Sequence, residues 1–132
     1  IDGWSYGGFM TISMFLKHPG VFNRASCGGP VIDWKYYEVM YGERYMDTPQ
    51  NNAEGYEKAS LLNYIDTMEG KLLIFHGALD PTVVWQNTLQ FIDKSIKAQK
   101  QVDYFIYPSH GHNVGGIDRL HLWKKIENFH AY

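Results

Sequence analysis

A short glycine-rich stretch near the start of the chain, Gly3 to Gly8, constrains the local fold more than any other part of the sequence. It fits the pattern G-x-S-x-G, in which a serine lies on a sharp turn between a strand and a helix. Gly3 and Gly7 flank Ser5 at points where a side chain would collide with neighbouring elements in so tight a turn. Because the pattern also occurs in ordinary glycine-rich loops, its meaning depends on the rest of the chain.

Beyond this turn, helical and strand patterns alternate. Residues 6–17 predict a helix that ends at His18 to Gly20. Residues 71–76 contain an apolar run bounded by glycines, which is typical of a buried parallel strand. We also expect strands over 22–26 and 102–107, and helices over 55–62, 85–96 and 118–130. Strands that alternate with helices indicate an α/β fold with a mostly parallel sheet flanked by helices.

Three of these helices should each bury an apolar surface. The first is apolar around most of its cylinder, which predicts burial on several sides. The other two carry stripes at the spacing of one helix face. These stripes are Trp85, Leu89, Ile92 and Ile96 in the helix over 85–96, and Leu122, Trp123, Ile126 and Phe129 in the last helix.

Composition limits the possible partners. The 132 residues suit one domain or part of one, and the formal net charge of -2 suggests no nucleic-acid or anionic-membrane partner. No apolar run approaches the roughly 18 residues that a membrane span needs. With Cys27 as its one cysteine, the chain can form no internal disulfide within these residues.

An acid and two histidines follow Ser5 in places that suit nucleophilic catalysis. A serine hydroxyl needs a general base, and the base needs an orienting carboxylate. Asp80 follows the strand over 71–76, at the carboxyl end where open α/β sheets place their sites; alternatively it only caps a helix before Pro81. His110 and His112 both follow the last strand, and spacing alone does not choose between them. The order Ser, Asp, His is that of α/β-hydrolases.

The remaining catalytic parts can also be assigned. The backbone N–H of Tyr6, next to the nucleophile, should be one donor of an oxyanion hole, and a second donor should come from upstream of the turn. His76 is expected to be a packed, hydrogen-bonded histidine. His18, His121 and His130 are expected to be structural or exposed.

The position of Ser5 so close to Ile1 predicts that more chain precedes it. In a doubly wound hydrolase, several strands come before the nucleophile turn. We therefore expect residues 1–132 to be the C-terminal part of an α/β-hydrolase domain. Alone they should be inactive, because they lack the upstream strands and the second oxyanion donor.

Several segments together resemble one family. The chain resembles the dipeptidyl peptidase IV branch of the prolyl oligopeptidase family of serine peptidases, which includes bacterial dipeptidyl peptidase IV and prolyl tripeptidyl aminopeptidase. The resemblance is carried by Gly3 to Gly8, Gly29 to Tyr37, Tyr41 to Met46, His76 to Asp80 and His110 to Val114. The likeness spans nearly the whole chain. It implies an N-terminal β-propeller, outside these residues, that gates access and binds the free amine of the substrate.

The resemblance also assigns residues. The family places its histidine before a small or amide residue and then a hydrophobic one, which selects His112. It implies that Val31, Trp34, Tyr37, Tyr41 and Val83 line a pocket for a P1 proline, with Tyr6 beside it. Aromatic walls can select the flat, apolar proline ring by shape and burial, although these side chains could equally be ordinary core residues.

One position departs from the family pattern. Dipeptidyl peptidase IV has an asparagine two residues after the acid, where it helps to hold the P2 carbonyl of the substrate. This chain has Thr82 there. The departure favours the tripeptidyl relatives.

The leading interpretation is a serine exopeptidase that releases N-terminal di- or tripeptides after proline through Ser5, Asp80 and His112. One alternative is an esterase or acylaminoacyl peptidase on the same fold. Another is a fragment that is noncatalytic by itself and acts in a dimer contact, through exposed aromatics on the last two helices. The resemblance implies no cofactor or metal, peptide substrates with proline near the N-terminus, a homodimer, and a periplasmic or secreted location.

Overall fold

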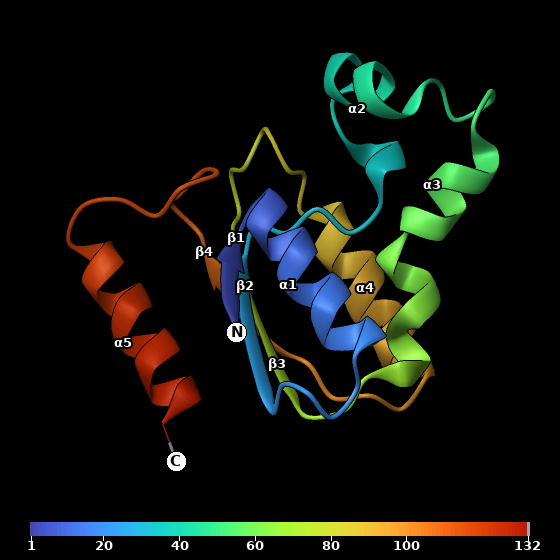
Figure 1. Cartoon of the computed structure of the whole chain (residues 1–132). Helices are drawn as coiled ribbons and strands as arrows, with labels where there is room; N and C mark the ends of the chain where they lie inside the picture. Colours follow the sequence, from blue (N-terminus) through green and yellow to red (C-terminus); the bar gives the residue numbers. More distant parts are fainter. Residues whose placement is uncertain (132) are drawn as a thin grey trace.

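A parallel sheet organises the chain, and its order follows the sequence. In the computed structural model, which describes residues 1–131, the strands pair in the order β1-β2-β3-β4 (Figure 1). All three pairings are parallel, as the α/β pattern predicts. The strands are β1 (Asp2–Trp4), β2 (Arg24–Gly28), β3 (Lys71–Gly77) and β4 (Asp103–Tyr107).

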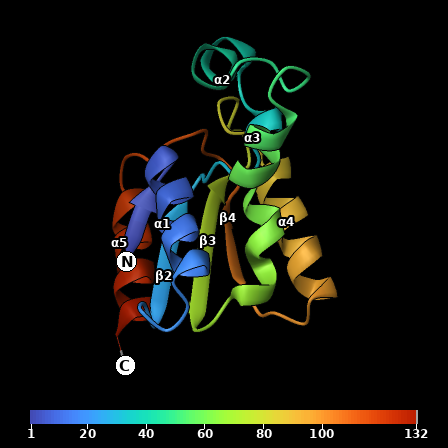
Figure 2. The same ribbon diagram turned by 45° about the vertical axis from the view of Figure 1, so that its right-hand side comes forward.

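Helices cover both faces of this sheet, which confirms the predicted layers. One face carries α1 (Tyr6–Lys17), α4 (Gln86–Lys97) and the segment around α3 (Ala53–Ala59), while α5 (Asp118–His130) lies on the other (Figure 2). The short α2 (Val39–Met46) stands beyond the end of the sheet. No helix among residues 1–131 is long and apolar enough to cross a membrane.

Strand β3 is buried on both sides, as its unbroken apolar run predicts. Leu72 and Ile74 join the core beneath α1 and α4, whereas Leu73 and Phe75 join a second core that includes Leu122 of α5. Because successive strand residues point to opposite faces, the run supplies both cores at once. Packing on both faces therefore fixes the position of β3 between the two layers of helices.

Two boundaries differ from the sequence-based expectation. Strand β2 begins at Arg24 and continues to Gly28, because it pairs with β3 along its whole length and with β1 from Ser26 to Gly28. A Cβ atom at Gly28 would overlap the rings of Trp4 and Phe75, so this end of the strand needs a glycine. The helix expected over 55–62 is instead α3 followed by a 3₁₀ helix over Leu61–Thr67, and the two meet at buried Ser60.

The prediction of which side of α4 (Gln86–Lys97) faces the interior is wrong. Leu89 and Ile96 are exposed, by 41% and 62%, while the buried side consists of Asn87, Thr88, Phe91 and Ser95. Polar residues point inward there because they have hydrogen-bond partners in the interior. The buried residues recur at a helical spacing, but the apolar pattern favoured an adjacent face of the helix, of which Trp85 and Ile92 are half-buried.

The other two helices also differ in part from the prediction. In α5, Trp123 was expected on the apolar side with Leu122, but it is 58% exposed while Leu122 is buried against the sheet. In α1, Met10 and Met14 are exposed, so this helix buries one face and not several. Its end at Lys17, before Pro19 and Gly20, agrees with the prediction.

Candidate active site

Ser5 is the single residue between β1 and α1, so strand and helix meet in the sharp turn that the G-x-S-x-G pattern predicts. Its φ of 57° is rare for a residue other than glycine and costs conformational energy. The turn is held by the Ser5 N–H, which donates to the Gly28 carbonyl of the neighbouring strand at 2.8 Å. A side chain at Gly3 would overlap the backbone of Gly7, which explains the first glycine. The collision expected at Gly7 is wrong, because a Cβ atom there would meet nothing within 4 Å.

Asp80 lies in the loop after β3, with its carboxylate almost completely buried. Its Oδ1 accepts the backbone N–H groups of Thr82 and Val83, at 2.8 and 2.9 Å. Its Oδ2 lies 2.7 Å from Nδ1 of His112. The carboxylate therefore has the position and contacts of a group that orients the imidazole of His112.

The two candidate histidines have different partners. His112 pairs with Asp80, and one fifth of its side chain remains exposed. Nε2 of His110 lies 2.7 Å from Oδ2 of Asp118, in the first turn of α5. The geometry thus separates two histidines that sequence spacing leaves equivalent, and it places His112 with the acid.

Ser5 and His112 both flank the Gly28–Gly29 corner at the end of β2. A Cβ atom built on Gly29 would lie 3.4 Å from Cε1 and Nδ1 of His112. On the other side, the indole N–H of Trp4 donates to the carbonyl of His112 at 3.0 Å. The residue before Ser5 therefore anchors the histidine loop, and the three candidates all lie at the carboxyl ends of the strands.

The start of α1 offers hydrogen-bond donors beside Ser5. The first intrahelical bond runs from the Phe9 N–H to the Ser5 carbonyl, at 3.0 Å. The N–H of Tyr6 precedes it and has no acceptor within the helix. It therefore suits an anion that forms next to the Ser5 hydroxyl.

An aromatic cluster borders the same turn. The ring centroids of Tyr6 and Trp34 are 5.9 Å apart, and Trp34 stacks on Tyr41 at 5.9 Å with an interplanar angle of 17°. Beside these rings lies a cavity of about 600 Å³. Its walls are mainly apolar: Tyr6, Phe9, Trp34, Tyr41, Gly42, Tyr45, Met46 and Ala59.

The predicted pocket residues divide into walls and support. Trp34 and Tyr41 line the cavity, whereas Val31 and Val83 are buried beneath them with Trp34. Tyr37 packs edge-on against Trp34, and burial, followed by the adjacent Tyr41, raises the pKa of its hydroxyl. Thr82 is exposed and contacts the acid only through its backbone N–H.

A buried polar network connects the acid loop to this pocket, and sequence reasoning missed it. Oδ1 of Asn87 accepts the N–H groups of Ile32 and Asp33, at 3.1 and 3.2 Å. Its amide nitrogen donates to the carbonyl of Val84 at 3.0 Å. Asn87 therefore holds the segment before Trp34 and the segment after Asp80 in one geometry. The helical spacing of Thr88, Phe91 and Ser95 was the available signal.

The other histidines behave as expected of structural residues. His121 lies 2.9 Å from the hydroxyl of Tyr107, and His130 lies 2.8 Å from that of Ser26.

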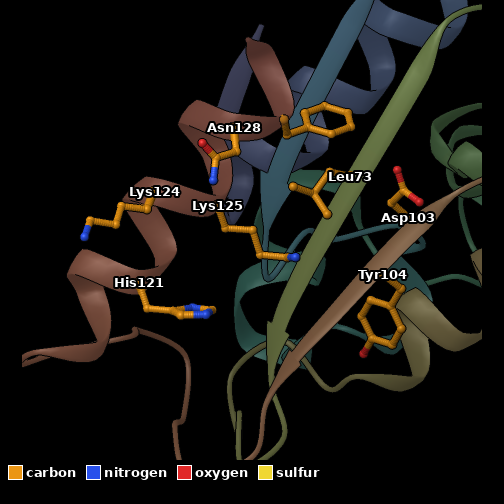
Figure 3. Close-up of a pocket in the computed structure, with 8 residues that line it drawn as sticks. Leu73, Asp103, Tyr104, His121, Lys124, Lys125 and Asn128 are labelled. Carbon is orange, nitrogen blue, oxygen red and sulfur yellow. The ribbon is translucent and has the colours of Figure 1, made fainter. Parts of the chain in front are cut away.

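A second cavity, of about 620 Å³, lies between β4 and α5, where Figure 3 shows Lys125 reaching toward the sheet. It is lined by Leu73, Asp103 and Tyr104 at the starts of strands, far along the sheet from Asp80. Within residues 1–131, no group of three His, Cys, Asp or Glu side chains could hold a metal ion.

Comparison with known proteins gives this arrangement a family. The sequence profile of the prolyl oligopeptidase family matches residues 1–131. The chain belongs to that family. An Arthroderma gypseum protein named as a dipeptidyl-aminopeptidase B is 43% identical over 129 residues, which are 96% of this chain and 14% of the relative.

Two solved bacterial structures show the same fold. A Bacteroides ovatus protein described as a dipeptidyl aminopeptidase IV superposes with a TM-score of 0.95 at 52% identity, over 97% of this chain and 18% of that one. Porphyromonas gingivalis dipeptidyl peptidase 4 gives a TM-score of 0.94 at 37% identity, over 98% and 18%. The chain thus spans less than a fifth of the length of these relatives.

Asn87 provides a test of the buried network. Asn87→Ala should lower the free energy of unfolding of the intact protein by roughly 1–3 kcal/mol, because two buried N–H groups lose their acceptor. Asn128→Ala, on the exposed surface of α5, is the matched control and should change it by less than about 0.5 kcal/mol. Chemical denaturation measures both. Equal effects would mean that Asn87 has no special structural role.

Proposed function

We propose that the protein containing this chain is a serine exopeptidase that releases N-terminal di- or tripeptides by cleavage after proline. The observation that carries the proposal is the Asp80–His112 pair at 2.7 Å, at the same end of the strands as Ser5 on its strained turn. Family membership and the dipeptidyl peptidase names of the relatives support the same activity. The whole reaction also requires parts of the protein beyond this chain.

The proposed reaction follows from the three side chains. Ser5 Oγ attacks the carbonyl carbon of the scissile bond, and Nε2 of His112 takes the hydroxyl proton. The carbonyl electron pair moves to oxygen, where the N–H of Tyr6 stabilises the negative charge. When the intermediate collapses, the C–N bond breaks and His112 gives its proton to the leaving amine. Water then repeats these steps on the acyl-enzyme and regenerates Ser5.

Preference for proline is assigned to the aromatic cavity next to the turn. Tyr6 lines that cavity and follows Ser5 directly, so a P1 side chain there would place its carbonyl near the nucleophile. The stacked rings of Trp34 and Tyr41 offer an apolar wall that a pyrrolidine ring can contact by its faces. A proline-sized group fills only part of about 600 Å³, which leaves room for closure by other parts of the protein.

Other features of the proposal concern the whole protein. Thr82, in place of an asparagine, favours tripeptide release, and the length of the peptide removed depends on residues outside this chain. We propose a homodimer in a periplasmic or secreted location. Exposed Leu120 and Trp123 on α5, and Ile117 just before it, suit such a contact. The exposed apolar residues of α4 are aliphatic and not aromatic as expected. Residues 1–132 alone should be inactive.

Replacement of the nucleophile tests the proposal directly. In the full-length protein, Ser5→Ala should abolish cleavage of Ala-Pro and Ala-Ala-Pro anilides, because no other group can form the acyl-enzyme. Labelling by a fluorophosphonate probe should disappear with it, while the thermal unfolding temperature stays the same. Turnover near that of the wild type would refute the role of Ser5. The ratio of the two wild-type rates decides between dipeptide and tripeptide release.

The histidine assignment has a built-in control. His112→Ala should lower kcat on the order of 10³-fold or more, because loss of a triad member leaves only binding and the oxyanion hole. His110→Ala removes only an exposed pair with Asp118 and should cost far less. Steady-state kinetics on an Ala-Pro anilide measures both variants. The opposite ranking would show that His110 is the base.

The cavity predicts a selective loss. Tyr41→Ala should lower kcat/KM for a P1 proline substrate more than for the matched P1 alanine substrate, because the lost contacts are with the ring. Tyr36 is the control, since it is exposed and does not line the cavity. Tyr36→Ala should leave the ratio of the two substrates unchanged. Equal losses for both substrates in Tyr41→Ala would point to a structural role.

A further inference from the structure

His76 occupies a fully buried position at the end of β3, directly behind the acid. Its Nε2 lies 2.8 Å from the carbonyl oxygen of Val83 and 3.2 Å from Oδ2 of Asp80. On the other side of the ring, Nδ1 lies 3.0 Å from the hydroxyl of Thr88 in α4. Each ring nitrogen therefore has a defined partner.

These partners determine where the proton lies. A carbonyl and a carboxylate can only accept, so Nε2 must carry the hydrogen that points at them. Burial lowers the pKa of His76 more than the adjacent carboxylate raises it, which leaves the ring neutral. Nδ1 is then an acceptor, and the hydroxyl of Thr88 is its donor. The two titratable groups that face the ring are Asp80 and His112.

We propose that His76 is a positioning residue for the triad: its Nε2–H, kept in one tautomer by Thr88, is shared between the Val83 carbonyl and the same Asp80 oxygen that receives the N–H of His112. This inference rests on the proposed function and adds a residue to it. His76 touches no substrate, so it acts only through Asp80.

The consequence for Asp80 is that hydrogen-bond donors occupy all the acceptor sites of its carboxylate. Oδ1 accepts from Thr82 and Val83, and Oδ2 accepts from His112 and His76. A carboxylate has about four lone-pair sites, so these donors use its whole capacity. No position remains in which the group can rotate to gain a better bond. The orientation of Asp80, and through it that of His112, is therefore fixed.

His76 also weakens the electrostatic interaction between the Asp80 carboxylate and His112. Its N–H draws on the negative charge of Oδ2, so the carboxylate stabilises a protonated His112 less than it would alone. Loss of the donor should strengthen that stabilisation. The acid limb of the activity profile, which reports protonation of the general base, should then move to higher pH.

A pair of variants of similar shape separates hydrogen bonding from packing. Glutamine at this position retains an N–H donor, and methionine, which has a similar length, does not. In the full-length protein, His76→Met should lower kcat on an Ala-Pro anilide by roughly 10- to 100-fold, the factor expected for a lost bond to a charged group. KM should stay within about twofold, and the acid limb should move up by roughly half a pH unit or more. His76→Gln should recover at least half of the lost activity on a logarithmic scale and return the limb toward its wild-type position.

Equal losses in both variants with an unmoved acid limb would overturn the proposal, because packing alone would explain them. If His76→Met does not fold, the tautomer of His76 in the wild-type protein tests the proposal instead. In the full-length protein with ¹⁵N-labelled histidine, and with His76→Gln to assign the signal, His76 should remain neutral and protonated on Nε2 between about pH 5 and 8. Protonation on Nδ1, or titration within that range, would overturn the proposal.

Failure of the proposed function gives a different result. If the wild type is not labelled at Ser5 by a fluorophosphonate, the peptidase assignment fails whatever the state of His76. If the wild type is labelled and His76→Met labels at the same rate with the same pH dependence, only the positioning role fails.

Discussion

Parallel pairing of β1 to β4 is the constraint on which the rest of the structure depends. It brings the carboxyl ends of the strands to one edge, where Ser5, Gly29, Asp80 and the loop before His112 follow directly. Residues more than a hundred positions apart become neighbours there without any long loop. Burial of β3 on both faces then holds the loop that carries Asp80 at a set depth.

Interior polar groups refine that arrangement, and α4 supplies two of them. Thr88 faces His76, and Asn87 holds the backbone on either side of the site. Their inward position displaces Leu89 and Ile96 to the surface, which is the reverse of what apolar patterning favours. A buried polar group costs free energy unless it is paired, so these residues can point inward only because partners meet them there. With polar residues on its inner side, α4 buries less apolar surface, but its side chains fix the geometry around Asp80.

Prediction from sequence was most accurate where a local signal coincided with tertiary structure. The strand over 71–76, the helices over 6–17 and 118–130 and the parallel α/β layers match the fold, and the family resemblance is confirmed. The candidate acid and the histidine chosen by resemblance lie in contact. The end of β2 and the inner face of α4 were misjudged, because both depend on partners distant in sequence. Val31 and Val83 were expected on the pocket wall and lie beneath it.

The sequence by itself determined the turn at Ser5, the alternation of strands and helices, and the order in which serine, acid and histidine occur. These follow from short-range steric limits and from hydrophobic periodicity, which are written along the chain. Spacing along the chain left His110 and His112 equivalent, and only the family resemblance favoured His112 before the tertiary structure placed it against Asp80. Only the tertiary structure decided that His76, Thr88 and Asn87 surround the site. Those contacts depend on where β3, α4 and the last loop lie relative to one another. Their relative positions are set by the packing of the two hydrophobic cores against the sheet.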